Sequence, residues 1–139
     1  MNQEQKEKIL SVLSKYTLGV LSTTTSDSLP ESALVGFAET KDLELVFGCF
    51  YTTRKYKNLQ SNQNVAFVVG GDDDKTIQYE GVVRELFGDE KDKYVAFHIQ
   101  KKPSFEKYAK MPGNCYFFVE PKWIRYVDLN KNENWEITF

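Results

Sequence analysis

Residues 45–59, LVFGCFYTTRKYKNL, contain two different patterns in direct succession. The first residues are apolar or small, which is typical of a buried strand. From Thr52 onward the period changes, because Tyr56 and Leu59 fall on one face of a helix that either of two threonines can cap. The stretch therefore predicts a strand that leads through a tight turn into a helix over residues 52–62.

The first turn of that predicted helix carries three cations, Arg54, Lys55 and Lys57. A helix dipole disfavours cations at this end by about 0.3–1 kcal/mol each. The same turn offers unpaired backbone N–H groups, and the Thr53 hydroxyl is a further donor. Together these groups predict an anion site, most naturally for a phosphate. Taken alone, the segment favours a solvated basic patch, and the order of the surrounding segments changes that balance.

The surrounding segments are mostly short apolar strands separated by polar turns. Helices are predicted for residues 3–16, 89–101 and 103–110. Strands are predicted for residues 18–25, 30–38, 43–49, 65–69, 76–87, 115–119, 123–127 and 135–139. The unbroken apolar run 65–69 predicts burial on both faces, and Gly81 predicts a bulge. Because these six to eight strands do not alternate regularly with helices, we expect a mainly β fold, an antiparallel barrel with peripheral helices, as a single domain over residues 1–139.

Composition argues against several classes of function. The chain has 18 basic and 20 acidic residues, so its net charge of -2 gives no reason to expect a nucleic-acid partner. No apolar run reaches the roughly 18–20 residues that span a bilayer, and the polar N-terminus predicts no secretory signal. Cys49 and Cys115 are expected to be free thiols in the cytoplasm. With one histidine, His98, in a charged stretch, a metal site is not expected, and chemistry is left to carboxylates, a thiol or an imported cofactor.

The order of motifs around residues 45–59 is more specific than any one of them. The strand, the Thr-Arg-Lys turn and the helix are followed by an Asn-containing turn and an apolar strand over residues 61–69, and then by a strand ending in Glu80-Gly81. This order resembles the pyridoxamine 5′-phosphate oxidase-like, FMN-binding split-barrel family, whose first two strands are matched by residues 18–23 and 29–37. The resemblance implies an antiparallel split β-barrel that binds flavin mononucleotide (FMN), and a homodimer with FMN at the subunit interface.

The resemblance also implies which residues contact the cofactor. The basic turn would hold the phosphate, residues 33–37 would bind the flavin ring through their backbone, and the end of the preceding strand would lie beside the ribityl chain. One of two polar residues on a later strand would bond to the isoalloxazine. The implied cofactor-binding set is Ala33, Leu34, Val35, Gly36, Phe37, Gly48, Cys49, Thr53, Arg54, Lys55, Thr76 and Gln78. No catalytic residue and no metal ligand is implied.

The chain departs from the true pyridoxamine phosphate oxidases at its end. Those enzymes carry an Arg-Leu-x-Pro-type signature, whereas this sequence ends in residues 135–139, WEITF, and has Val127 where they carry a late-strand Trp. Oxidation of vitamin B6 is therefore not expected, and the chain is more similar to the small general-stress-protein branch. We expect a flavin-dependent oxidoreductase that acts on an unidentified small substrate. The alternatives are a flavin-binding or stress-related protein without turnover, and a split barrel that holds a deazaflavin or haem, haem being the weakest because His98 lies on a charged helix.

Overall fold

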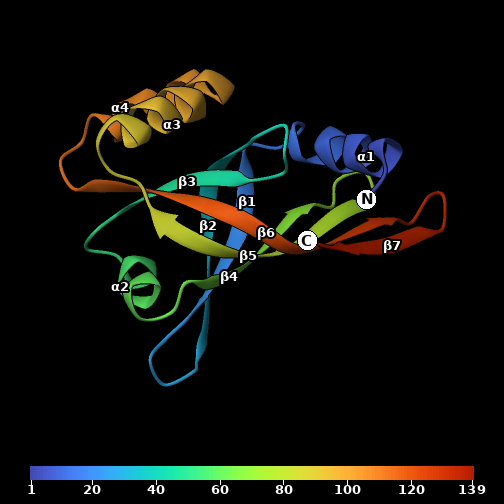
Figure 1. The fold of residues 1–139 in the computed structure, drawn as a ribbon, viewed down its shortest axis with the longest axis horizontal. Coiled ribbons are helices and arrows are strands. Elements are labelled where there is room, and N and C mark those ends of the chain that lie inside the picture. Colours follow the sequence, from blue (N-terminus) through green and yellow to red (C-terminus); the bar gives the residue numbers. More distant parts are fainter.

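Seven strands and four α-helices make up residues 1–139, all of which are described by the computed structural model (Figure 1). The strands are β1 (Leu18–Thr24), β2 (Pro30–Glu39), β3 (Leu45–Phe50), β4 (Asn64–Gly70), β5 (Lys75–Glu85), β6 (Asn114–Asp128) and β7 (Glu133–Thr138). The helices are α1 (Gln3–Leu13), α2 (Arg54–Ser61), α3 (Gly88–Lys101) and α4 (Glu106–Ala109), with a 3-10 turn, η1 (Pro103–Phe105), between the last two. None of the helices is long and apolar enough to cross a membrane.

The strands form one antiparallel sheet in the order β3-β2-β1-β4-β5-β6-β7. A further pairing of β3 with β6 closes six of these strands into a barrel, and β7 extends from β6 outside the closure. The helices lie at the periphery, with α3 and α4 together over one end of the barrel, α1 over the other and α2 beside the end of β3 (Figure 1). The predicted mainly β, antiparallel split barrel with peripheral helices is confirmed.

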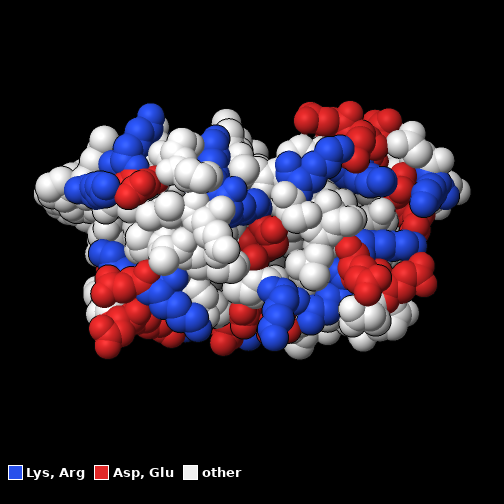
Figure 2. Space-filling model, turned by 90° about the horizontal axis from the view of Figure 1, so that it is seen from above, with Lys and Arg blue, Asp and Glu red and all other residues white.

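Alternation along the strands fills the barrel with aromatic side chains. Phe47 and Phe117 stack with their ring centroids 5.3 Å apart, and Phe67 meets Phe47 edge-on. The prediction that residues 65–69 are buried on both faces is wrong, because β4 also alternates and Val68 remains 48% exposed on the outside of the barrel. The outer surface carries charges of both signs, which are interspersed on the face that Figure 2 shows.

The pairing of β5 with β6 explains a second difference from the sequence-based prediction. The register shifts between Glu80 and Gly81, which confirms the predicted bulge. A Cβ atom at Gly81 would lie 2.5 Å from the Glu120 carbonyl oxygen, so no side chain fits there. Two strands were predicted on either side of Pro121, but β6 is continuous from Asn114 to Asp128. Pro121 pairs with Gly81 at the register shift, where the regular ladder is already interrupted and a missing N–H is tolerated.

Candidate functional site

The barrel is split between β2 and β3. The two strands pair only from Phe37 to Glu39, so the part of β2 before Phe37 has β1 on one side and an open edge on the other. Phe37 donates its N–H to Thr17 on the β1 side, and backbone groups alternate in direction along a strand. The backbone polar groups of Leu34 and Gly36 therefore point to the open edge. One of them, the Gly36 carbonyl, accepts a hydrogen bond from His98 Nε2 at 2.9 Å.

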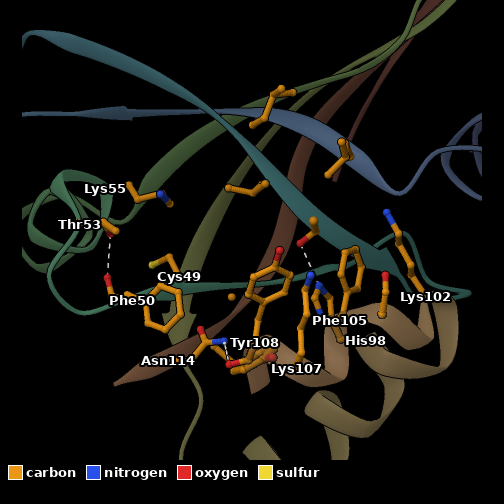
Figure 3. A pocket seen from close by; sticks show the side chains of 17 residues that line it. Cys49, Phe50, Thr53, Lys55, His98, Lys102, Phe105, Lys107, Tyr108 and Asn114 are labelled. Atoms are coloured by element: carbon orange, nitrogen blue, oxygen red, sulfur yellow. Dashed lines mark hydrogen bonds between the residues drawn. The ribbon is translucent and has the colours of Figure 1, made fainter. Parts of the chain in front are cut away.

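A cavity of about 470 Å³ lies along this open edge. Its walls come from β2, from the ends of β3 and β6, and from α3 and the segment that follows it (Figure 3). Thr53 and Lys55 lie at one end of the cavity, and His98 and Phe105 lie at the other (Figure 3). Seven of the predicted cofactor-binding residues line it: Leu34, Val35, Gly36, Gly48, Cys49, Thr53 and Lys55.

The basic turn forms the first turn of α2, as its sequence predicts. Thr53 is the N-cap, and its Oγ1 accepts a hydrogen bond from the Tyr56 N–H at 3.4 Å. The same hydroxyl donates to the Phe50 carbonyl at 2.8 Å, so its proton is already used within the chain. The backbone N–H groups of Arg54 and Lys55 have no acceptor in the protein. The free donors for an anion are thus these two amides and the side chains beside them.

A second hollow of about 340 Å³ adjoins the cavity and shares Thr53 and Lys55 with it. It contains Ala33 and Arg54, two further residues of the predicted set. The Arg54 guanidinium forms an ion pair with the Glu31 carboxylate at 2.7 Å. Glu31 also accepts a hydrogen bond from the buried Asn58 amide at 2.7 Å, which holds the carboxylate in place. The ion pair between Arg54 and Glu31 was not predicted from the sequence, because the two residues lie on different elements.

The electrostatics of the main cavity favour an anionic ligand. Its wall includes three lysines, Lys55, Lys102 and Lys107, and no aspartate or glutamate. None of the three forms an ion pair within the chain. Uncompensated positive charge at a concave, partly apolar surface attracts phosphate or carboxylate groups. No group of three or more histidine, cysteine, aspartate or glutamate side chains gathers as metal ligands.

Three predicted residues do not line either hollow. Phe37 is fully buried in the core, where the Lys101 ammonium lies 3.9 Å from its ring centroid. Thr76 and Gln78 lie on β5 and point to the outside of the barrel. Register places Gln78 opposite Val68, Val68 opposite Val20 and Val20 opposite Leu34, so two strands separate Gln78 from the open edge of β2. Within one chain, these two polar residues cannot contact a ligand in the cavity.

His98 lies on the charged helix α3, as expected, but its side chain is buried. The residue is 5% exposed, and its ring stacks on Phe105 with the centroids 4.4 Å apart. Burial, with a smaller contribution from Lys101, lowers the pKa of the imidazole below its usual value, which favours the neutral form of the ring. A signal was present in the sequence, since His98 follows Tyr94 by four residues on the inward face of α3.

Two buried polar atoms of the cavity residues have no hydrogen-bond partner, namely His98 Nδ1 and Asn114 Oδ1. Such atoms are rare in native interiors. Cys49 is opposite Cys115 in the β3–β6 register, and both are free thiols. Burial raises the pKa of Cys49 to about 11, so its thiol is a weak nucleophile. The cavity therefore offers binding groups rather than a reactive side chain, which suits an organic cofactor with its own reactivity.

Comparisons with known proteins agree with this architecture. The family model described as pyridoxamine 5′-phosphate oxidase matches residues 5–128. General Stress Protein 26 from Bacillus anthracis has 23% identity and a TM-score of 0.73, over 97% of this chain and 100% of that chain. The heme storage protein HutZ from Vibrio cholerae has 12% identity and a TM-score of 0.73, over 95% of this chain and 92% of that one.

A heme-binding protein from Mycobacterium smegmatis has a higher TM-score, 0.86, at 15% identity. The alignment covers 99% of this chain but 59% of the mycobacterial protein, so that protein is considerably longer. No curated protein matches the sequence. At these identities the structural likeness establishes the fold, and the ligand has to be argued from the cavity itself.

Proposed function

Because the chain belongs to the pyridoxamine 5′-phosphate oxidase family, we propose that residues 1–139 form one FMN-binding domain that acts as a flavin-dependent oxidoreductase on an unidentified small substrate. One observation carries the proposal. The unpaired amides of Arg54 and Lys55 open beside a cavity that contains lysines and no carboxylate. This combination suits a phosphate attached to a larger, partly apolar group. FMN, when bound, would supply the electron-transfer chemistry.

The remaining cavity residues fit the rest of FMN. Gly48 and Cys49 lie next to the phosphate turn, where a ribityl chain would follow. The open edge of β2 offers the N–H and C=O groups of Leu34, which can pair with the alternating donors and acceptors at the polar edge of a flavin ring. Phe105 and Tyr108 cover the cavity from the segment after α3 and would keep water from the ring.

A homodimer with FMN at the subunit interface is part of this proposal. Leu18 and Leu34 line the cavity and also belong to an exposed apolar surface, the outer face of β2-β1-β4, that includes Val20 and Val68. A second copy would cover this surface. Gln78 borders the same face, so in a two-fold dimer the partner subunit's Gln78 could reach the ring that one chain's Gln78 cannot.

Haem is a second candidate ligand. Two of the similar proteins are described as heme-binding or heme-storing, and His98 lines the cavity. Histidine is a common axial ligand of haem iron. Against haem, the His98 ring is held between Phe105 and Tyr116, and the lysine-rich wall favours a phosphate. A deazaflavin would use the same phosphate turn as FMN.

The absorption spectrum of the freshly purified protein separates these ligands. We expect the two bands of an oxidised flavin, released as FMN on denaturation. A Soret band would instead support haem. A single absorption band at a shorter wavelength than the long-wavelength band of oxidised flavin would support a deazaflavin. Anaerobic reduction of bound FMN by NADH or NADPH would then separate an oxidoreductase from a flavin-binding protein without turnover.

We expect the protein in the cytoplasm, where its two free thiols stay reduced.

The phosphate assignment has its own test. Replacing Arg54 and Lys55 together with Ala should weaken FMN binding by at least about a hundredfold, because each charge-assisted contact contributes about 1.5–3 kcal/mol. Fluorescence titration with FMN and with riboflavin measures the effect, and riboflavin, which lacks the phosphate, should bind both proteins alike. Lys57→Ala is the matched control, because Lys57 lies on the same helix but outside both hollows. Equal FMN affinity in the double variant and the wild type would contradict the assignment.

A further inference from the structure

The carboxylate of Glu31 lies between two residues of α2. Arg54 and Asn58 are four positions apart, so they share one face of the helix. Glu31 Oε2 is 2.7 Å from Arg54 Nη1, and Glu31 Oε1 accepts a hydrogen bond from Asn58 Nδ2, also at 2.7 Å. Each carboxylate oxygen therefore has its own partner on α2, and Glu31 joins β2 to both residues.

A buried network holds Glu31 in this position. Thr23 is opposite Glu31 in the β1–β2 register, so the two side chains point to the same face of the sheet. Asn58 Nδ2, which donates to Glu31, also donates to Thr23 Oγ1 at 3.0 Å. Thr23 and Asn58 are both buried. Both protons of the Asn58 amide are thus used, and the Glu31 carboxylate is fixed by groups of the interior.

Arg54, in contrast, is held by Glu31 alone. Its side chain is 79% exposed, and its guanidinium has no second ion pair or hydrogen bond within the chain. An arginine side chain without a partner would lose conformational entropy on binding a ligand. The pair with Glu31 confines the guanidinium to the second hollow, beside the unpaired amides of Arg54 and Lys55. A guanidinium has five N–H donors, so donors remain for an anion.

Glu31 has two opposing effects on a phosphate at these amides. Its negative charge repels the phosphate, whereas its hold on Arg54 keeps a cation next to the amides. The repulsion acts past an exposed guanidinium and is screened by water and salt, while the contact with Arg54 is direct. We propose, on the basis of the proposed function, that Glu31 is a positioning residue that holds the Arg54 guanidinium for the FMN phosphate. Asn58 and Thr23 support Glu31 in this role.

A double-mutant cycle between Glu31 and Arg54 tests the proposal. Arg54→Ala should weaken FMN binding about tenfold in the wild type but about threefold or less in the Glu31→Gln background, where the guanidinium is no longer held. Glu31→Gln alone should weaken FMN binding about threefold, because the single oxygen of Gln cannot serve both Arg54 and Asn58 as the carboxylate does. Fluorescence titration measures these affinities, and riboflavin should bind all four proteins alike. Glu136→Gln is the matched control, since it removes the same charge from β7, outside both hollows.

A second readout needs no flavin. The chain has three arginines, at positions 54, 84 and 125, so ¹⁵N NMR can follow each Nε group separately. In the free wild type we expect the heteronuclear NOE of Arg54 Nε to be close to that of Arg84, which pairs with Glu90. In Glu31→Gln the value for Arg54 should fall toward that of a mobile side chain, and the value for Arg84 should not change.

The outcomes separate this inference from the proposed function. An equal or larger effect of Arg54→Ala in the Glu31→Gln background, or tighter FMN binding by Glu31→Gln, would overturn the inference and leave FMN binding intact. A mobile Arg54 Nε in the free wild type would also overturn it. An equal loss of riboflavin and FMN affinity in Glu31→Gln would overturn it as well, because the change would then not act through the phosphate. If the wild type binds no FMN, the proposed function fails and this inference fails with it, even where NMR shows Arg54 held.

Discussion

Gly36 lies where β2 separates from β3, and the ring of Phe105 covers it. A Cβ atom at Gly36 would be 2.6 Å from Phe105 Cζ, far inside van der Waals contact. We expect Gly36→Ala to lower the free energy of unfolding by about 1–3 kcal/mol, the usual cost of overpacking, because Phe105 and the stacked His98 must both move. Urea denaturation measures the change. Phe105→Ala should lower the free energy of unfolding less in the Gly36→Ala background than in the wild type, because it removes the clash. If the two losses simply add in the double variant, the clash is not the cause.

The lowered pKa of His98 makes stability depend on pH. Its folded-state pKa is lowered from the ordinary value of 6.5, chiefly by burial and then by Lys101. Below about pH 6.5 the unfolded chain binds a proton on this imidazole, whereas the native protein does not. Stability is therefore lost as pH falls, and it levels off below the folded-state pKa. We expect the urea midpoint to fall more between pH 7.5 and 5.0 in the wild type than in His98→Gln. Parallel falls would assign the effect to the carboxylates that both proteins share.

At the scale of elements, the N-cap of α2 links stability to the basic turn, residues 53–55. Thr53 Oγ1 receives the Tyr56 N–H and donates to the Phe50 carbonyl, so it joins β3 to the helix. Thr53→Ala should reduce the free energy of unfolding by about 1 kcal/mol, whereas Thr53→Ser keeps both hydrogen bonds and should cost a few tenths. Chemical denaturation without added ligand measures both variants. Equal losses in the two would indicate that the methyl group, not the hydroxyl, is responsible.

Local elements could be predicted from the sequence, and their pairing could not. The helix expected over residues 52–62 is observed as Arg54–Ser61, because its cap and its apolar face are contiguous in the chain. The break expected at Pro121 is absent, because its tolerance depends on Gly81 in a different strand. Val68 was expected to be buried, and its exposure depends on which face of β4 meets the core. The spacing of residues within one segment does not show which strand pairs with that segment or which of its faces meets the core.

At the scale of the whole molecule, the candidate site has a predictable half and an unpredictable half. The basic turn is one run of residues, so its motif can be recognised in the sequence. The other end of the cavity exists because α3 returns over β2 and brings His98 to Gly36, 62 positions away in the chain. Thr76 and Gln78 show the converse: their place in a family pattern is recognisable, but within one chain they lie outside the cavity.

That separation makes the oligomeric state a decisive property of the molecule. Four apolar side chains are exposed on one face of the sheet. Their exposed fractions are 47% for Leu18, 36% for Val20, 68% for Leu34 and 48% for Val68. If a second copy covers this face, Val68→Lys would bury a charge there, and we expect it to convert a dimer at micromolar concentration into a folded monomer. Light scattering coupled to size exclusion measures the mass.

The same variant should also bind FMN more weakly, because a monomer lacks the partner subunit's Gln78, although Val68 lines neither of the two hollows. Leu129→Lys is the matched control, since Leu129 is 70% exposed in the turn between β6 and β7, away from this face, and should leave mass and affinity unchanged. A Val68→Lys protein that remains dimeric would place the interface elsewhere. A monomer with undiminished FMN affinity would show that one chain completes the site, and Gln78 would then have no part in it.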